Sequence, residues 1–160
     1  MLGRLAKWLR IIGLDVFYSN SVQDDELLEL CSSEKRILLT RDTELARRAK
    51  KKMRVIFIEG DRLREQFVSL RGNLMIKPDA SRLFSRCVAC NTPLLHVNRE
   101  EVEGRVPAFV FDNRDDFKTC PKCQKVYWKG SHVDHTMKML DESLFGAKEP
   151  SAEEKSPASD

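Results

Sequence analysis

The chain has 160 residues, of which 41% are hydrophobic and 33% are charged, and its net charge is +3. This length fits one domain with a small extra module, and the composition excludes a fully disordered or a fibrous chain. The apolar runs are far shorter than the ~20 residues of a membrane span, and the amino terminus lacks a secretory pattern. We therefore expect no membrane segment and an intracellular location, in the cytoplasm or the nucleus.

The first 78 residues alternate helical and extended patterns. Leu2, Leu5, Leu9 and Ile12 share one helical face, with the basic residues largely off it, and predict a helix that ends at Gly13. The pattern then predicts a strand at 15–18, a helix at 24–33, a strand at 36–40, a helix at 42–52, a strand at 54–58 and a helix at 61–70. The last two strands are apolar on both faces, which is typical of a parallel sheet covered by helices. Residues 1–78 are thus predicted to form an α/β domain.

From residue 82 the pattern changes to cysteine pairs, short extended runs and turn residues. Extended runs at 94–97, 108–111 and 126–128 predict a small, mostly β module, and a helix is expected within 131–144. Residues 145–160 are rich in Ala, Ser, Pro, Glu and Lys and contain almost nothing to bury, so we expect a disordered tail. The predicted second domain therefore spans 82–144.

Four of the five cysteines form two Cys-x-x-Cys pairs. A reduced chain with paired thiolates at this spacing favours a tetrahedral zinc site, closed and structural, over disulfides. The expected ligands are Cys87, Cys90, Cys120 and Cys123. His132 and His135 have the right chemistry for zinc, but four sulfurs already fill the site, so both are expected at the surface. Cys31 lies alone on a helical pattern and is expected to be a buried apolar side chain.

Basic and aromatic residues mark candidate contacts with nucleic acid. Residues 1–86 carry 18 Lys and Arg against 12 Asp and Glu, an excess that permits a polyanionic partner such as RNA. The candidate phosphate-binding residues are Arg41, Arg47, Arg48, Lys50, Lys51 and Lys52, for which a solvated helix face is the alternative. Tyr127 and Trp128, beside a cysteine pair, fit either base stacking or the small core of a zinc module.

Acidic residues follow the predicted strands. Asp42 lies where a buried strand ends and a helix begins, and this edge of an α/β sheet is where ligands bind. A carboxylate there can bind Mg²⁺ or Mn²⁺, and the alternative role is an ordinary helix N-cap. Asp24 and Asp25 open the preceding helix, and Glu59 and Asp61 follow the next strand, so several carboxylates are candidates to gather at one end of the sheet.

Four sequence strings resemble those of one known family. They are MLGRLAKWLR at residues 1–10, LLTRD at 38–42, the first cysteine pair with its flanking Arg86 and Asn91, and the second pair running into YWKGSH at 127–132. Over about residues 1–140 the chain resembles the Mut-seven C-terminal RNase domain family, a PIN-domain-like nuclease fold fused to a zinc ribbon. That domain is found alone in prokaryotes and at the carboxyl end of the exonuclease mut-seven homologues.

The resemblance implies metal-dependent RNA cleavage by a cluster of acidic residues. By position, Asp42 is the firmest match, Asp25 or Asp24 is the next, and Glu59 and Asp61 are weaker. Family members place a strand ending in aspartate before the Met-Leu-Gly-Arg-Leu segment, whereas this chain begins at that Met. The expectation is therefore a PIN-like domain without its first strand and first acidic residue, with little or no nuclease activity. The alternative is a non-catalytic RNA-binding or protein-interaction module held by its zinc ribbon and basic face.

Overall fold

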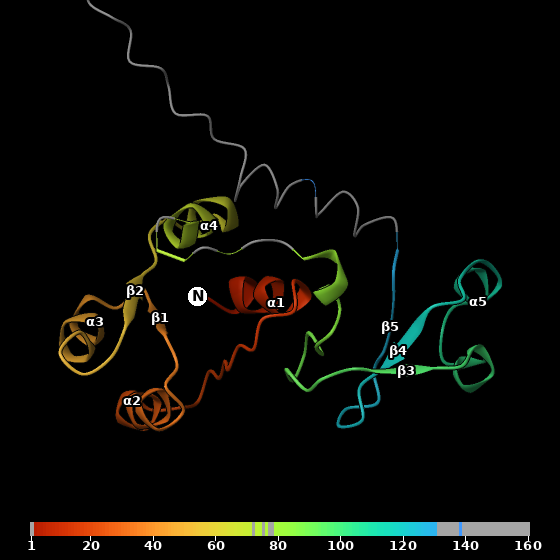
Figure 1. Cartoon of the computed structure of the whole chain (residues 1–160), viewed down its shortest axis with the longest axis horizontal. Helices are drawn as coiled ribbons and strands as arrows, with labels where there is room; N and C mark the ends of the chain where they lie inside the picture. Colours follow the sequence, from red (N-terminus) through yellow and green to blue (C-terminus); the bar gives the residue numbers. More distant parts are fainter. Residues whose placement is uncertain (1, 72, 75, 77–78, 131–137, 139–160) are drawn as a thin grey trace, which may run out of the picture.

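The computed structural model describes residues 2–71, 73–74, 76, 79–130 and 138 (Figure 1). Their elements are α1 (Gly3–Ile11), α2 (Asp24–Ser33), β1 (Leu38–Thr40), α3 (Thr43–Ala49), β2 (Val55–Phe57), α4 (Leu63–Arg71), η1 (Ala80–Arg82), β3 (Leu95–Val97), η2 (Arg99–Val102), α5 (Ala108–Asn113), β4 (Phe117–Thr119) and β5 (Val126–Trp128). The predicted α/β class is confirmed. The helix expected within 131–144 and the tail at 145–160 lie outside the described residues, apart from residue 138. No helix in the described part is long and apolar enough to cross a membrane.

The first sheet pairs β1 with β2 in parallel. Leu38 lies opposite Val55, and Thr40 lies opposite Phe57. Backbone hydrogen bonds extend the pairing at both ends, because the N–H of Leu38 donates to the carbonyl of Arg54 (3.0 Å) and the N–H of Ile58 donates to that of Thr40 (2.8 Å). The parallel arrangement confirms the sequence prediction, and it brings the carboxyl ends of both strands to one edge.

Helices cover both faces of this sheet. On one face, Ile56 and Ile58 pack with Leu5 and Leu9 of α1 and with Phe67 of α4. The opposite face is covered by α2 and α3, and its core consists of Cys31, Leu38, Leu45 and Ala49. This double burial explains why both strands are mainly apolar. Cys31 is buried, as its isolated position on a helical pattern predicted.

The second sheet is antiparallel, with the strand order β3-β4-β5. Phe117 of β4 is 1% exposed and packs with Val102 and Val106 from the segment between β3 and β4. Trp128 of β5 packs against the same small cluster. The mostly β character predicted for this region is confirmed, and it gives the region a hydrophobic core of its own.

The strand predicted at residues 15–18 is wrong. The N–H of Val16 donates to Oδ1 of Asn91 (3.0 Å), and the carbonyl of Val16 accepts from Nε of Arg10 (2.9 Å). Side chains therefore satisfy the backbone groups that a neighbouring strand would otherwise pair. Partners 6 and 75 residues away from Val16 give no local sequence signal.

The extended run predicted at 108–111 is also wrong, because these residues open helix α5. Pro107 precedes the helix, and its carbonyl accepts from the N–H groups of Val110 (2.9 Å) and Phe111 (3.0 Å). Proline is common at a helix start, where its missing N–H has no consequence. Val110 and Phe111 then pack on the core of the second sheet, and that contact outweighs their strand propensity.

The two halves of the chain meet at the end of α1, which lies between the two sheets in Figure 1. The N–H of Phe84 donates to the carbonyl of Ile11 (2.9 Å), and the Arg82 guanidinium donates to the carbonyl of Gly13 (3.3 Å). Gly13 has a φ of +86°, and a Cβ at this position would lie 2.4 Å from the carbonyl oxygen of Arg82. Only glycine fits this close approach. The division into domains at residues 78–82 stays a prediction.

Candidate metal centre and carboxylate edge

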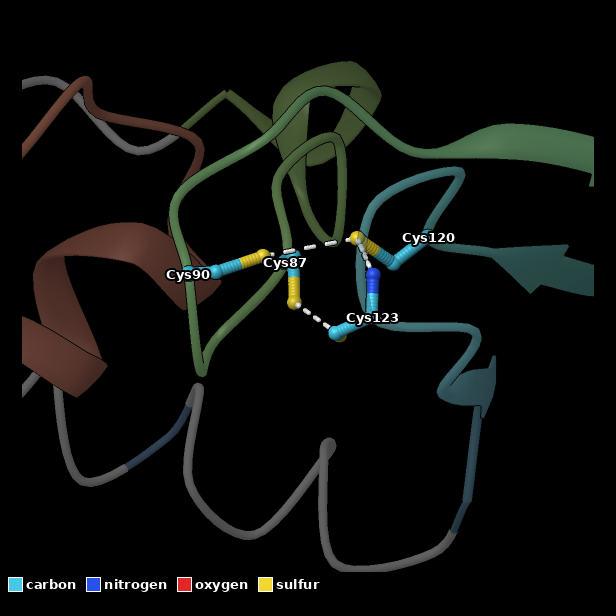
Figure 2. A group of neighbouring side chains, drawn as sticks. All are labelled: Cys87, Cys90, Cys120 and Cys123. Carbon is cyan, nitrogen blue, oxygen red and sulfur yellow. Dashed lines mark hydrogen bonds between the residues drawn. The ribbon is translucent and has the colours of Figure 1, made fainter.

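The side chains of the four paired cysteines point toward one another from two turns of the second module (Figure 2). Their Sγ atoms all lie within 4.8 Å of one another, with 3.5 Å between Cys87 and Cys123 and 3.4 Å between Cys90 and Cys120. A tetrahedral zinc ion with Zn–S bonds of about 2.3 Å requires S···S distances of about 3.8 Å. The thiols are free and too far apart for disulfides, so the donors and their spacing fit one zinc ion.

The two cysteine turns have the same backbone construction. In each, the residue after the second cysteine donates its N–H to the carbonyl of the first cysteine, from Asn91 to Cys87 (2.8 Å) and from Gln124 to Cys120 (2.9 Å). Asn91 and Gln124 both have positive φ, at 67° and 60°. Such a turn leaves both thiols of a pair pointing to the same side. Asparagine tolerates this left-handed conformation, so its place after Cys90 was a usable sequence signal.

The environment of the first cysteine pair favours the thiolate form that binds metal, because the pKa values of Cys87 and Cys90 are lowered, whereas the pKa of Cys123 is raised to about 12. A hydrogen bond with the Thr92 hydroxyl is the main influence that lowers the pKa of Cys90 to about 6. The backbone N–H of Cys123 points at Sγ of Cys120 (3.4 Å) and adds a further donor to the sulfur cluster. Four thiolates around Zn²⁺ leave a net charge of −2, so a nearby cation stabilises the loaded site. His132 and His135 lie outside the described residues.

That cation is Arg10, which the helical pattern had placed largely off the buried face of α1. The whole residue is only 5% exposed. Its guanidinium donates to the carbonyls of Val88 (3.0 Å) and Ala89 (2.9 Å), the two residues between the first pair of cysteines, and to the carbonyl of Val16. Burial lowers the pKa of Arg10, and the charges of Cys87 and Cys90 oppose that shift. Arg10 therefore fixes the first cysteine turn to α1.

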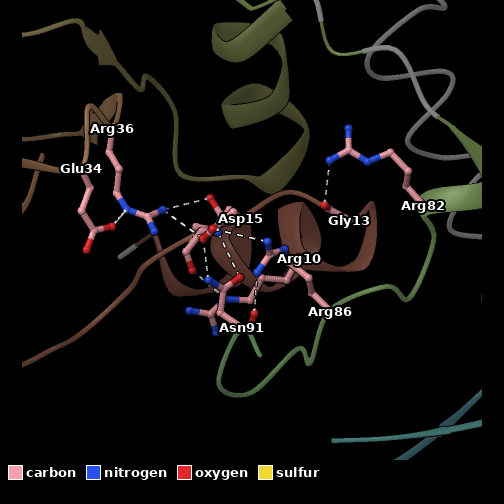
Figure 3. A network of polar contacts seen from close by, with 9 residues as sticks. Arg10, Gly13, Asp15, Glu34, Arg36, Arg82, Arg86 and Asn91 are labelled. Atoms are coloured by element: carbon pink, nitrogen blue, oxygen red, sulfur yellow. Dashed lines mark hydrogen bonds and ion pairs between the residues drawn. The ribbon is translucent and has the colours of Figure 1, made fainter. Parts of the chain in front are cut away.

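A second polar network supports the same contact (Figure 3). Asp15 accepts from Nδ2 of Asn91 (2.8 Å), and it forms ion pairs with Arg36 (3.0 Å), which precedes β1, and with Arg86 (3.4 Å), which precedes Cys87. The hydrogen bond from Arg36, followed by that from Asn91, lowers the pKa of the Asp15 carboxyl. Asp15 thus connects the approach to β1 with the first cysteine turn. Nothing in the sequence indicated that Arg10, Asp15 and Asn91 contact one another's segments, because the partners of these side chains are distant along the chain.

The predicted acidic residues lie after the strands of the parallel sheet or in the first turn of α2. Asp42 follows β1 directly and is the N-cap of α3, since its Oδ1 accepts from the N–H of Leu45 (2.8 Å). Asp24 and Asp25 lie in the first turn of α2, where Arg48 of α3 forms ion pairs with both. These contacts bring the start of α2 to α3, while the capping role found for Asp42 leaves its catalytic assignment a prediction.

Of the other two acidic candidates, one has an ion pair on its carboxylate and the other is in contact through its backbone. Asp61 forms an ion pair with Arg41 (2.6 Å), and the N–H of Glu59 donates to the hydroxyl of Ser69 (3.0 Å). Within the part of the chain that the structure describes, the four cysteines are the one group of three or more His, Cys, Asp or Glu side chains close enough to share a metal ion. The described carboxylates form no comparable three-ligand group.

The six basic candidates fall into two sets. Arg41, Arg47 and Arg48 form ion pairs with acidic residues of the same half. Lys50, Lys51 and Lys52 follow α3, are exposed, and form no ion pair with any residue that the structure describes. The three lysines are therefore the charges most available to an external phosphate.

One comparison with known proteins gives a match, and it spans both halves of the chain. The family model described as Mut7-C RNAse domain matches residues 1–140. This range includes the carboxylate edge, the Arg10 contact and all four cysteines. No curated protein and no solved structure matches the chain.

We predict one zinc ion per chain, held by the four cysteines. Cys120→Ser removes a ligand and should lower the zinc content of purified protein to well below one equivalent. Cys31→Ala is the matched control, because Cys31 is a buried thiol outside the cluster. Metal analysis by mass spectrometry checks both variants. Full zinc content in Cys120→Ser, or none in the metal-replete parent chain, would contradict the assignment.

We also predict that Arg10 is a major source of stability. Arg10→Ala removes a charged donor from three carbonyls and should lower the free energy of unfolding by about 3 kcal/mol. Arg10→Lys keeps the charge without the planar fork, so it should recover part of the loss. Urea unfolding of the zinc-loaded chain measures both. Lys7→Ala, an exposed change on the same helix, should cost less than about 0.5 kcal/mol, and an equally small loss for Arg10→Ala would refute the prediction.

Proposed function

This chain belongs to the Mut7-C RNAse domain family, which implies a nuclease-type function, and on that premise we propose that it hydrolyses RNA phosphodiester bonds with a divalent cation. The observation that carries the proposal is the family match over residues 1–140, which takes in both the parallel sheet and the cysteine cluster. The proposed cation is Mg²⁺ or Mn²⁺, which binds oxygen ligands and stabilises charge at a phosphate. Zinc is assigned to the cysteines in a structural role.

Asp42 is the proposed principal catalytic residue. It lies after β1 at the carboxyl edge of the sheet, the position where α/β folds bind ligands. Its Oδ1 caps α3, and its other carboxylate oxygen accepts no hydrogen bond from a described residue. That second oxygen can therefore bind a cation while the cap stays intact.

Asp25 and Asp24 are the proposed supporting ligands. Their partner Arg48 lies at the surface, where the Asp25 side chain is 87% exposed. Exposed ion pairs contribute between 0 and about 1 kcal/mol, so exchanging Arg48 for a divalent cation has a small cost. The released guanidinium would then be free to bind an RNA phosphate.

The basic residues provide the proposed contacts with the RNA backbone. Lys50, Lys51 and Lys52 lie just after α3, whose first turn begins at the Asp42 cap. Arg47 and Arg48 lie in the last turn of α3, next to these lysines, and Arg41 lies before the start of the same helix. Phosphate contacts of this kind position the strand and carry no sequence information.

A second candidate function is a non-catalytic RNA-binding or protein-interaction module. The arrangement of the acidic residues favours it, because Asp42 caps a helix, Asp24 and Asp25 pair with Arg48, and no three described carboxylates converge. A divalent ion at a phosphate needs several fixed oxygen ligands. Cleavage assays separate the two functions, since only the first includes hydrolysis of RNA.

The sequence led us to expect little or no nuclease activity, but the family match over both halves of the chain favours activity. We therefore predict Mg²⁺- or Mn²⁺-dependent cleavage of single-stranded RNA that requires Asp42. Asp42→Asn keeps a good N-cap and so tests the charge without loss of the helix start. It should reduce the cleavage rate on the order of a hundredfold, because the ion loses an anionic ligand. Asp112→Asn, an exposed acidic residue on α5, is the matched control.

The rate of release of labelled fragments decides between the functions. Cleavage by the Asp42→Asn variant at the parental rate would remove Asp42 from the site. If the parent chain binds RNA but cleaves none with either ion, the non-catalytic function is correct.

RNA affinity should fall steeply with salt and depend on the lysines after α3. Lys50→Ala/Lys51→Ala removes two proposed phosphate contacts, so the slope of log K against log salt should become shallower by about 1.4. Arg62→Ala/Arg64→Ala, a pair of exposed cations beside α4, is the charge-matched control. Fluorescence anisotropy of a labelled oligonucleotide from 50 to 200 mM salt gives the slopes. Equal slopes in the two double variants would mean that the lysines face solvent and do not contact RNA.

A further inference from the structure

A hollow of about 310 Å³ lies beside the cysteine cluster, between the second sheet and the segment that leads into it. His96, Lys118 and Tyr127 lie opposite one another on β3, β4 and β5, so their side chains share one face of the sheet. All three line the hollow, together with Phe84 on the leading segment. Its volume lies at the lower end of the range for sites that bind small molecules or single nucleotides.

The hollow carries positive charge with unused hydrogen-bond donors. Lys118 is half-buried, and its ammonium donates to the carbonyl of Phe84 (3.3 Å), so two of its three N–H groups form no hydrogen bond with a described residue. Lys129 lines the same hollow and is exposed. Asp116 is the acidic residue of the lining, and it lies 3.3 Å from Nδ1 of His96. Both lysines therefore have N–H groups that can bind an anionic ligand.

Aromatic side chains form the remaining walls. Phe84 and Tyr127 line the hollow, and Tyr127 lies on the face that it shares with Lys118. Trp128 also lines the hollow, but it lies opposite Phe117 and packs on the other face of the sheet. The hydroxyl of Tyr127 lies 3.1 Å from Sγ of Cys87, which holds the Tyr127 ring in place. Phe84 has a φ of +50°, an uncommon conformation for a residue with a side chain. Fixed rings next to cations are the combination that binds single-stranded nucleic acid, where a ring stacks on a base and a cation contacts the phosphate.

We infer that this hollow is a subsite for one nucleotide of single-stranded RNA. The base would stack on the aromatic wall, and the phosphate would accept hydrogen bonds from Lys118 and Lys129. The inference rests on the proposed function for the class of its ligand. It adds a second RNA contact, on the far side of α1 from the lysines that follow α3 (Figure 1).

The test measures binding of a labelled single-stranded RNA decamer to the zinc-loaded chain with no Mg²⁺ or Mn²⁺ added. Phe84→Gly removes the ring and suits the positive φ, and it should weaken binding about tenfold at every salt concentration. Lys129→Glu should weaken binding and make the salt slope shallower by about 0.7. Lys122→Glu, the same charge change at an exposed lysine outside the hollow, should have a smaller effect on both.

A second readout reports on the hollow itself. In a Trp8→Phe background, Trp128 is the one tryptophan left, and its fluorescence should change as RNA or uridine monophosphate is added. Zinc content and thermal unfolding of Phe84→Gly establish that it is folded, and Lys129→Glu alters an exposed side chain that contributes little to stability.

The outcomes separate this inference from the proposed function. Parental affinity in both Phe84→Gly and Lys129→Glu, with no fluorescence change, would overturn the subsite while RNA binding elsewhere on the chain stands. No RNA binding by the parent chain would overturn the subsite together with the RNA ligand of the proposed function. Weaker binding in both variants, with normal affinity in Lys122→Glu, would support the subsite.

Discussion

The Arg10 guanidinium is the interaction on which the rest of the structure depends. It is buried between α1 and the first cysteine turn, and it donates to three carbonyls that have no other donor among the described hydrogen bonds. A buried charge is stable only when its hydrogen bonds are complete, so α1 and the turn must keep this relative position. Asp15 reinforces the contact by linking Asn91 of the turn to Arg36 before β1.

This arrangement would give a zinc ion bound by the four cysteines a stabilising role beyond the second module. The first sheet has two strands of three residues each, and α1 supplies Leu5 and Leu9 to its core. A sheet of this size depends on its covering helices for stability. A zinc ion on the four cysteines would fix the first cysteine turn, and Arg10 connects that turn to α1, which packs on the sheet through Leu5 and Leu9. Asp42 lies at the carboxyl edge of the same sheet. We therefore regard the cysteine cluster as part of the support for the proposed RNA site.

Local patterns in the sequence predicted those parts of the structure that depend on residues close together in the chain. The spacing of the cysteines predicted the cluster, and continuous apolar runs predicted β1 and β2 as buried parallel strands. Arg10 was beyond such reasoning, because a basic residue on an amphipathic helix normally faces solvent and its partners lie 78 and 79 residues away. The strand expected at 15–18 failed for the same reason, and the helix at 108–113 shows packing on Phe117 prevailing over intrinsic propensity.

Hydrogen exchange of the zinc-loaded and zinc-stripped chain tests the central claim most directly, because it reports on each segment separately. If the cysteine turn holds α1 through Arg10, removing zinc with a chelator should reduce the protection of backbone amides in residues 3–11 as well as in residues 85–128. Addition of zinc should restore both. Protection of α1 that stays unchanged while residues 85–128 lose theirs would contradict the account, since it would show that the two halves are stabilised independently.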